Sequence, residues 1–445
     1  MITYSIINKS ELEGAHRLDA EYYQPEYLEI AKILQNTPHK NFDEVVSNII
    51  NGAEIREYVE EDGLPYLRVS DIKEFFIDLS SVVHVTKESK IKQNIKLKEN
   101  DILLSRSGSL AIAAVVTPDL SNSIISSHLM RIPARGINPY FLVTFLNSKF
   151  GKAQIMQRNN GTIVPEINHP SLKSLSVPVL SEDTQKEIEK IVRNAYEKVQ
   201  ESNKIYSQAE NLLLEELGLK NFEVEDDLSY IVNLSEIKSS HRADAEYFQP
   251  KYDKLVEKLK KHNTKLLKEL VRRVKTKTRT KSEEVYKYIE ISDISVGSGD
   301  VSFNEIIGKE LPANARIPIK GDELLVSKVR PTRGAIAIVP NNFDNNFICS
   351  GAFSVFSAPE VMKEYLFVVS RSIVGKLQFE KPTTGTSYPT ITDEDVENLI
   401  IPVLPKSTQQ KIADLVQKSH EARSIAKQLL EQAKHKVEQL IESKK

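Results

Sequence analysis

The sequence predicts an α+β fold: two tandem, mainly β domains related by a pseudo-two-fold axis and separated by two long antiparallel coiled-coil helices. Three observations lead to this prediction. Motifs of the first half return about 225 residues later, each copy contains a series of short β-type runs, and each copy ends in a long heptad pattern. We expect the first domain at 1–180, a central helix at 181–220, the second domain at 221–405 and a C-terminal helix at 406–445.

The repeat is most evident in the segment that opens each copy. Residues 16–27 read His-Arg-Leu-Asp-Ala-Glu-Tyr-Tyr-Gln-Pro-Glu-Tyr, and residues 241–252 read His-Arg-Ala-Asp-Ala-Glu-Tyr-Phe-Gln-Pro-Lys-Tyr. Later matches follow in the same order, for example 177–180 against 401–404. A period above roughly 200 residues is far too long for a solenoid unit, so each copy is expected to be a complete domain with its own core.

Each copy begins with a predicted helix and continues with predicted strands. In the first copy, Leu18, Tyr22, Tyr27 and Leu34 fit one face of a helix. Short runs bounded by Gly, Pro, Asn and Asp follow, which is typical of strands joined by irregular loops. These runs are 66–72, 81–85, 101–104, 111–116 and 123–130. Residues 139–146 then read as a helix that starts at a proline.

The end of each copy has apolar residues spaced alternately by four and three positions, a pattern typical of a coiled coil. The residues expected at this helix–helix contact, or at a contact with a partner, are Ile188, Val192, Val199 and Leu213 in the first copy and Ile412, Val416, Leu430 and Val437 in the second. Weak seam positions, at Ser202, Ser419 and Arg423, are expected to be gaps filled by another protein. The two helices are expected to pair because they are tethered; the alternative is that each packs on its own domain.

The composition is that of an ordinary globular protein. Hydrophobic residues make up 40% and charged residues 27% of the chain, with a net charge of −2. Cys349 is the one cysteine, which excludes an internal disulfide or a cysteine-based metal framework, and no metal site is expected. Residues 1–10 lack the features of a secretion signal, and the longest apolar run, 110–116, is too short to cross a bilayer. A cytoplasmic protein without a membrane partner is expected.

Motifs that carry catalysis are missing from the sequence. Neither Gly151-Lys152 nor Gly375-Lys376 has the upstream glycine and the hydroxyl residue of a phosphate-binding loop. Asn138-Pro139-Tyr140-Phe141 lacks the second proline of the motif found in amino-methylating DNA methyltransferases, and it is better explained as a helix start. We therefore expect a chain that is not an enzyme.

A basic segment distinguishes the second copy from the first. Residues 272–281 alternate Lys and Arg with small hydroxyl residues, and this alternation suits phosphate contact through both charge and hydrogen bonds. The candidates for phosphate contact are Lys275, Lys277, Arg279 and Lys281. The alternative is that this segment is solvated surface.

Taken together, the doubled Arg-x-Asp-Ala-Glu-Tyr segments, the doubled ends of each domain and the long heptad helices resemble the specificity subunits of type I restriction-modification systems. The doubled ends run from Gly161-Thr162 to Gln185 and from Gly385-Thr386 to Gln409. The resemblance covers essentially the whole chain. It implies two target recognition domains, each reading one half of a bipartite, asymmetric DNA sequence, with the helices fixing the unread spacer.

The resemblance also implies the partners. These are double-stranded DNA, two modification (methyltransferase) subunits that dock on the helical regions, and restriction subunits that complete the cleaving complex. It implies no cofactor in this chain, because S-adenosylmethionine is expected on the modification subunit.

Residues that read DNA are expected on loops that follow strands, because bidentate donors and short hydroxyl or amide side chains must be presented to base edges. The candidates in the first copy are Arg68, Arg106, Ser107, Asn159, Asn160 and Thr162. Those in the second copy are Lys328, Arg330, Arg333, Thr384, Ser387 and Tyr388. Two other hypotheses remain open: an assembly scaffold without a nucleic-acid role, and an enzyme with its own unrecognised cofactor site.

Overall fold

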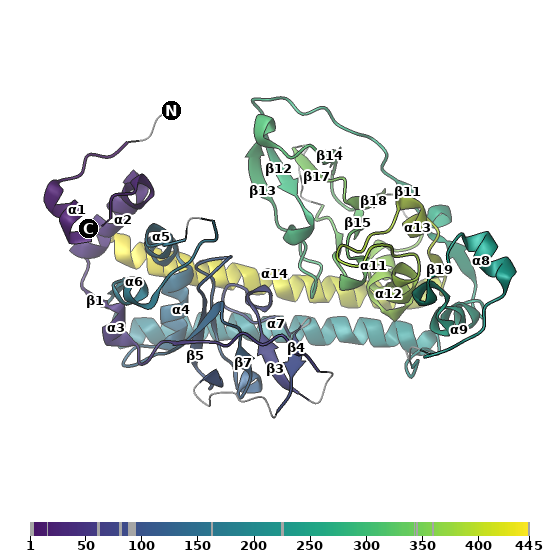
Figure 1. Cartoon of the computed structure of the whole chain (residues 1–445), viewed down its shortest axis with the longest axis horizontal. Helices are drawn as coiled ribbons and strands as arrows, with labels where there is room; N and C mark the ends of the chain where they lie inside the picture. Colours follow the sequence, from purple (N-terminus) through teal and green to yellow (C-terminus); the bar gives the residue numbers. More distant parts are fainter. Residues whose placement is uncertain are drawn as a thin grey trace. The chain divides into compact units, whose positions relative to one another are not determined.

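The chain divides into two compact units in the computed structural model, and each is described by itself (Figure 1). Unit 1 comprises residues 1–199 and 423–445, and unit 2 comprises residues 200–422. The structure describes residues 4–15, 17–59, 63–79, 82–87, 95–161, 163–223, 227–341, 343, 346–357 and 360–443. The domain boundaries expected from the sequence stay a prediction.

Unit 1 folds into small sheets covered by short helices. Its short helices are α1 (Lys9–Ala15), α2 (Pro25–Asn36), α3 (Phe42–Val45), α4 (Pro139–Asn147), α5 (Lys149–Gln157) and α6 (His169–Lys173). Its strands are β1 (His39–Asn41), β2 (Ile50–Asn51), β3 (Leu64–Leu67), β4 (Val83–Val85), β5 (Asp101–Ser105), β6 (Ala113–Val115), β7 (Ile124–Ile125), β8 (Leu129–Pro133) and β9 (Ser176–Pro178). One sheet has the order β2-β8-β5-β6 and another the order β4-β3-β7, while β1 pairs with β9.

Unit 2 repeats this plan. Its short helices are α8 (Leu234–Ser240), α9 (Pro250–Leu259), α10 (Leu267–Leu270), α11 (Lys363–Arg371), α12 (Ile373–Glu380) and α13 (Asp393–Glu397). Its strands are β10 (Thr264–Leu266), β11 (Arg272–Arg273), β12 (Val285–Ile289), β13 (Asn304–Ile307), β14 (Ala315–Pro318), β15 (Leu324–Ser327), β16 (Ile336–Ile338), β17 (Phe347–Ser350), β18 (Phe353–Ser357) and β19 (Ile400–Pro402).

The sheets of unit 2 match those of unit 1 except for one additional strand. One has the order β11-β18-β15-β16, a second the order β13-β12-β17-β14, and β10 pairs with β19. The central pair of the second sheet is parallel in both units, β3 with β7 and β12 with β17. Figure 1 shows β12, β13, β14 and β17 together in one part of unit 2, and β15 and β18 beside α11. Because strand order and direction agree, the sequence repeat is a structural repeat, with β14 added to one edge in unit 2.

The predicted helix at 139–146 is confirmed as α4, and its start has a clear cause. The Asn138 side chain accepts hydrogen bonds from the backbone N–H groups of Tyr140 and Phe141, and Pro139 occupies the first helical position. Apolar residues surround this helix, and Phe141 and Phe145 are fully buried in the core of unit 1. In unit 2, α11 holds the same place, with Tyr365 and Phe367 buried in the core.

The two heptad segments form long helices, α7 (Glu182–Glu216) and α14 (Lys406–Glu442), as predicted. Each contributes to both units, and the two pack against each other within each unit. In unit 1, Ile188 and Val192 of α7 share a core with Val437 of α14. In unit 2, Leu213 of α7 shares a core with Ile412 of α14. The remaining predicted contact residues, Val199, Val416 and Leu430, are buried or partly buried.

The weak positions of the heptad pattern are corrected by the structure. Ser202 and Ser419 were expected to be gaps filled by another protein, but both are buried and face each other in unit 2. Their hydroxyl oxygens lie 2.9 Å apart, and Ser419 Oγ also lies 2.9 Å from the carbonyl oxygen of Ser202. The two serine hydroxyl groups therefore form a hydrogen bond with each other where the helices approach closely. Ala422, and not Arg423, occupies the next buried position of α14.

The helix predicted for the opening segment is also corrected. Residues 20–23 form a single 3₁₀ turn, and α2 starts separately at Pro25. The break follows from Pro25, which disfavours the helical conformation at the residue before it, and Gln24 is extended with φ −60° and ψ 140°. Leu18 consequently lies on no helical face and is 87% exposed.

Two predicted strands differ from those observed. The run 66–72 is a strand only to Leu67, because Val69–Asp71 form a 3₁₀ turn. The run 123–130 is divided between β7 and β8, and a turn at 127–128 separates them. Ser81, at the start of another predicted strand, lies outside the described residues, and β4 covers 83–85.

Cys349 is fully buried in β17, and burial raises the pKa of its thiol to about 12. At pH 8 the thiolate, which is the reactive form, is therefore almost absent in the folded protein. We expect no measurable reaction of the native chain with a thiol-specific disulfide reagent at pH 8, and one equivalent of reaction after unfolding in denaturant. Rapid reaction of the native chain would contradict the described packing.

Candidate nucleic-acid interface

Each unit has a loop pair in which the segment after a central strand meets a loop further along the chain. In unit 1, the Gly108 N–H donates to the Pro165 carbonyl at 3.0 Å, and the Ile167 N–H donates to the Arg106 carbonyl at 2.9 Å. In unit 2, the Arg330 N–H donates to the Pro389 carbonyl at 2.7 Å, and the Ile391 N–H donates to the Lys328 carbonyl at 2.9 Å. The same backbone frame thus brings together most of the residues predicted to read DNA.

We call the second member of each pair the reader loop: residues 159–167 in unit 1 and 383–391 in unit 2. The tip of each loop is exposed to solvent. Ile163 is 95% and Val164 51% exposed in unit 1, and Tyr388 is 60% exposed in unit 2. Exposed apolar and aromatic side chains on a fixed backbone are suited to contact thymine methyl groups or unstacked base faces.

In unit 1, Arg106 and Ser107 connect the two parts of the frame. The Arg106 guanidinium forms an ion pair with Glu166 and donates a hydrogen bond to the Ser127 carbonyl at 3.3 Å. Ser107 is buried and forms a backbone bridge with Glu166. Arg106 is engaged with the protein in this structure, so it could donate to a base only by exchanging its Glu166 contact.

Asn159 and Asn160 organise the reader loop of unit 1. Asn159 Oδ1 accepts hydrogen bonds from the N–H groups of Gly161 and Glu166, both at 2.9 Å. Asn160 Nδ2 donates to Ser171 Oγ at 3.2 Å. These amides close the loop on itself. Thr162, the remaining candidate of this loop, lies outside the described residues.

Arg68 lies at the end of β3. It is one-third exposed, and its side chain pairs with the fully buried Asp71 at 3.3 Å. The Arg68 backbone N–H also donates to Asp71 Oδ2 at 2.8 Å. Arg68 is thus part of a local turn at the end of β3.

We call the backbone frame of each unit together with its reader loop the reader frame, and in unit 2 Arg330 is the candidate best placed in it. It has φ 47° and ψ 52°, the left-handed region that non-glycine residues rarely adopt. Its guanidinium lies 5.5 Å from the Tyr388 ring centroid and donates to the Ser387 carbonyl at 3.4 Å. Arg333 and Thr384 are exposed beside it, at the end of the 3₁₀ turn Pro331–Arg333 and at the base of the reader loop.

Lys328 belongs to a partly buried charge network beside the reader loop. Its ammonium lies 2.9 Å from Asp393 Oδ1, which also accepts from Ser354 Oγ at 2.6 Å, and Arg273 lies 2.5 Å from Asp393 Oδ2. Burial acts to raise the pKa of Asp393, but the hydrogen bonds from Ser354 and Lys328 and the charges of Lys328 and Arg273 lower it below its usual range. The carboxylate stays charged at neutral pH and fixes the loop to β11.

The basic segment continues from β11 across the edge of unit 2. Its backbone is held by the Val274 N–H, which donates to the Val355 carbonyl at 2.8 Å, and by the Thr278 N–H, which donates to the Arg316 carbonyl at 3.0 Å. Between and after these points Lys275, Lys277, Arg279 and Lys281 are exposed. Lys281 forms a surface pair with Glu284 at 2.6 Å. We call residues 274–281 the basic strap.

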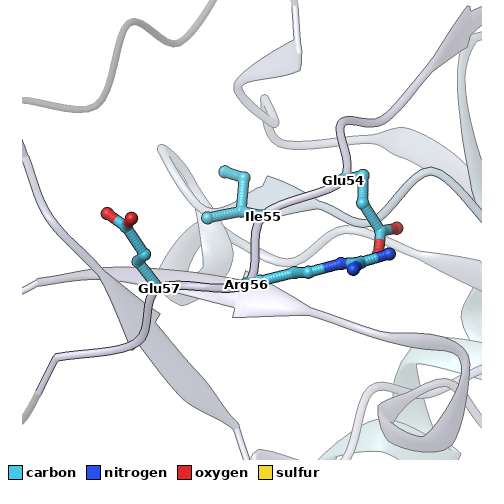
Figure 2. A pocket seen from close by; sticks show the side chains of 4 residues that line it. All are labelled: Glu54, Ile55, Arg56 and Glu57. Atoms are coloured by element: carbon cyan, nitrogen blue, oxygen red, sulfur yellow. The ribbon is translucent and has the colours of Figure 1, made fainter.

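The corresponding segment of unit 1 has no such charge. Residues 52–59 follow β2 as the basic strap follows β11, with Ala53 bridged to Ser126 and Glu54 accepting from Ser127 Oγ at 2.9 Å. Figure 2 shows Glu54 and Arg56 close to each other and Glu57 pointing away. A hollow lies beside these side chains. The hollow has a volume of about 400 Å³ and is lined by these residues and Ile55. Two acids and one base make it a poor match for a phosphate, so the two units differ in their electrostatics.

The residues that support the frame were not among the candidates predicted from the sequence. Arg17 and Arg242 of the doubled opening segment contact the reader loops, and Arg273 and Asp393 fix the loop of unit 2. The repeated Arg-x-Asp motif could have marked Arg17 and Arg242 as important, but it does not indicate which residues they contact. Among the described residues, no group of His, Cys, Asp and Glu could hold a metal ion, and no helix is long and apolar enough to span a membrane.

Sequence comparisons show which proteins the chain is similar to. Residues 260–435 match the family model described as the type I restriction modification DNA specificity domain. The specificity subunit of the type I restriction enzyme HindI from Haemophilus influenzae is 30% identical over 133 residues, which are 28% of this chain and 29% of that protein. The specificity subunit of the enzyme EcoBI from Escherichia coli is 27% identical over 138 residues, which are 31% of this chain and 29% of that protein. The matched segments span less than a third of either relative.

Solved structures of specificity subunits are similar at a lower level. A type I restriction-modification S subunit from M. genitalium is 12% identical, with a TM-score of 0.38 over 91% of this chain and 95% of that one. The HsdS subunit from Thermoanaerobacter tengcongensis is 15% identical, with a TM-score of 0.30 over 91% and 96%. Both TM-scores lie below 0.5, so the assignment rests on the sequence matches. The resemblance predicted from the doubled motifs is confirmed: residues 260–435 match the type I restriction modification DNA specificity domain, and the chain is similar in sequence to specificity subunits of type I restriction enzymes.

Proposed function

We propose that the chain directs a modification complex to a bipartite, asymmetric DNA target, with each unit reading one half. The observation that carries this proposal is the pair of reader frames. They share the same backbone hydrogen bonds but present different side chains, Arg106-Ser107-Gly108 in one and Lys328-Val329-Arg330 in the other. The same backbone arrangement with different side chains favours recognition of two different half-sites.

The recognition domains proposed are residues 1–180 and 221–405, joined by helices at 181–220 and 406–445. The candidates for DNA contact are those named above, with the reader frames contacting bases and the basic strap contacting phosphates. Base contacts specify the sequence and phosphate contacts position the protein on the duplex, so the two groups have separable effects.

The helices are proposed to set the unread spacer between the half-sites. With 35 residues in α7 and about 1.5 Å of rise per residue, the helix is about 52 Å long. Half-sites read on one face of B-DNA lie about 34–36 Å apart per turn. A helix of this length can therefore span that separation.

The partners proposed are double-stranded DNA, two modification subunits and restriction subunits. S-adenosylmethionine is proposed to bind the modification subunit, and the chain itself is proposed to catalyse nothing. The lack of recognisable catalytic motifs in the sequence supports this part of the proposal.

The proposal is tested by co-expressing the full chain with its modification subunit and mapping methylated positions across a genome. We expect one motif with two defined halves and an undefined spacer. Exchanging residues 1–180 with residues 221–405 is expected to exchange the order of the two halves. An undivided motif, or methylation without sequence preference, would refute the proposal and favour a scaffold.

Replacing Arg330 with alanine is expected to alter base preference in one half-site only. The guanidinium is the only side chain of the unit 2 frame with bidentate donors held beside an exposed aromatic ring among the described residues, and a bidentate contact is worth about 1–3 kcal/mol of discrimination. Selection from a random DNA pool measures this. Lys238→Ala, which removes an exposed charge from α8 in the same unit, serves as the control and should leave the selected sequence unchanged.

A further inference from the structure

The doubled Arg-x-Asp motif forms the same contact in both units. In unit 1, Arg17 Nε and Nη2 donate to the two carboxylate oxygens of Asp19 at 2.5 and 2.6 Å. The remaining donors reach the base of the reader loop. Arg17 Nη2 donates to the Asn159 carbonyl and Nη1 to Asn160 Oδ1, both at 3.1 Å.

Unit 2 reproduces this arrangement with different loop residues. Arg242 Nε and Nη2 donate to Asp244 at 2.6 and 2.5 Å. Arg242 Nη1 donates to the Pro382 carbonyl at 3.2 Å and Nη2 to the Thr383 carbonyl at 3.3 Å. Asn159 and Thr383 are corresponding positions of the repeat. The contact to their carbonyl groups therefore persists although the side chains have changed.

Aromatic rings complete each contact. The Arg17 guanidinium lies 5.2 Å from the Tyr22 ring centroid, and that of Arg242 lies 4.9 Å from the Tyr247 ring. Gln157 at the end of α5 donates to the Tyr22 carbonyl at 3.1 Å, which ties the opening segment to the helix before the reader loop. The arginine side chains are 26% and 22% exposed, so both contacts are partly shielded from water.

The contacted residues are the hinge points of the reader loops. In unit 1 the Asn160 N–H donates to the Glu166 carbonyl at 2.8 Å, which closes the loop directly after the Arg17 contact. In unit 2 Thr384 and Thr390 exchange backbone hydrogen bonds of 3.0 and 2.9 Å directly after the Arg242 contact. The exposed tips lie between these closing bonds. Fixing the base of each loop therefore fixes the direction in which its tip projects.

We propose that Arg17 and Arg242 are positioning residues for specificity, each latching the reader loop of its own unit; this inference rests on the proposed function. A planar guanidinium can satisfy a carboxylate with one edge and two loop acceptors with its other donors. A lysine ammonium keeps the charge but lacks this fork. The latch thus depends on geometry, and charge alone does not maintain it.

The test uses the full chain with its modification subunit and the variants Arg17→Lys and Arg242→Lys. We expect Arg17→Lys to lower the preference for the correct base over other bases about tenfold at positions read by unit 1, which is roughly the effect of one mismatched base pair. Recognition of the other half-site should not change. Arg242→Lys should do the reverse. Binding to non-specific DNA and its salt dependence should stay the same, since no charge is lost.

Arg56→Lys is the matched control, because Arg56 is 85% exposed and contacts no reader loop in the described part of unit 1. Asp19→Asn should reproduce the effect of Arg17→Lys, because it leaves the guanidinium without its ion pair. Equal losses in both half-sites, or an equal loss on non-specific DNA, would show a general structural role and overturn the inference.

Hydrogen exchange separates the latch from the proposed function. Without DNA, Arg17→Lys should increase amide exchange at Asn160, Gly161 and Glu166, and Arg242→Lys should do so at Thr384 and Thr390. Unchanged exchange at these amides would overturn the latch whatever the DNA results are. If exchange changes as expected but the wild-type complex methylates no divided motif, the latch stands and the proposed function fails.

Discussion

Replacing Arg131 with valine is expected to lower the free energy of unfolding of unit 1 by about 3–5 kcal/mol, because it leaves the buried Asp101 carboxylate without its ionic partner. Arg131 Nε lies 2.5 Å from Asp101 Oδ2, and the two side chains are 7% and 5% exposed. Their strands β5 and β8 are adjacent in the central sheet. Chemical denaturation followed by circular dichroism, with limited proteolysis to locate the weakened unit, measures the loss.

Unit 2 supplies the control for this experiment. Glu323 and Val355 stand where unit 1 has Asp101 and Arg131, and the Glu323 carboxylate accepts from the N–H groups of Lys320 and Gly321 at 3.0 and 2.8 Å. The double variant Asp101→Glu, Arg131→Val copies this solution and should recover more than half of the lost stability. A single variant as stable as the wild type, or a double variant no better than the single one, would contradict this account of the pair.

Replacing Lys275, Lys277 and Arg279 together with alanine is expected to weaken DNA binding roughly a hundredfold at physiological salt, without changing the preferred sequence. Each lost phosphate contact reduces the slope of log K against log salt by about 0.9 unit, so the slope should fall by about three. The three side chains are exposed, and the backbone beneath them is held at Val274 and Thr278. Binding titrations at several salt concentrations measure both effects.

The comparison for the strap variant is Lys260, Lys261 and Lys268 replaced with alanine. These lysines are exposed in the same unit and carry the same total charge, but they lie outside the strap. They should change the slope by less than one unit. An equal effect from both sets would mean that net charge, and not the strap, determines affinity. A changed sequence preference would mean that strap residues contact bases.

The long-range plan of the fold was predictable because it depends on periodicity and repetition. Heptad spacing alone placed Ile188, Val192, Leu213 and Ile412 in buried positions. It could not show that Ser202 and Ser419 satisfy each other, because that depends on which residues meet across two helices. Nor could the apolar pattern at 18–34 show that Gln24 is extended before Pro25.

The candidate site was predictable as a region but not as a set of contacts. Strand–loop–strand order indicated the loops at Arg106 and Arg330 correctly. The ion pair of Arg106 with Glu166 and that of Lys328 with Asp393 join residues about 60 positions apart, and nothing in the local sequence specifies such partners. The role of Arg17 was hidden for the same reason, since its loop partners lie 142 and 143 positions away.

The division of α14 between the units has a consequence for biosynthesis. Unit 2 is a continuous stretch that is finished once residue 422 has left the ribosome, whereas the hydrophobic core of unit 1 includes Ala433, Val437 and Ile441. The half that is translated first must therefore wait for residues 433–441 before its core is complete. Nascent unit 1 is therefore expected to leave Ile188 and Val192 uncovered until this part of α14 has been made, and exposed apolar surface of this kind favours aggregation.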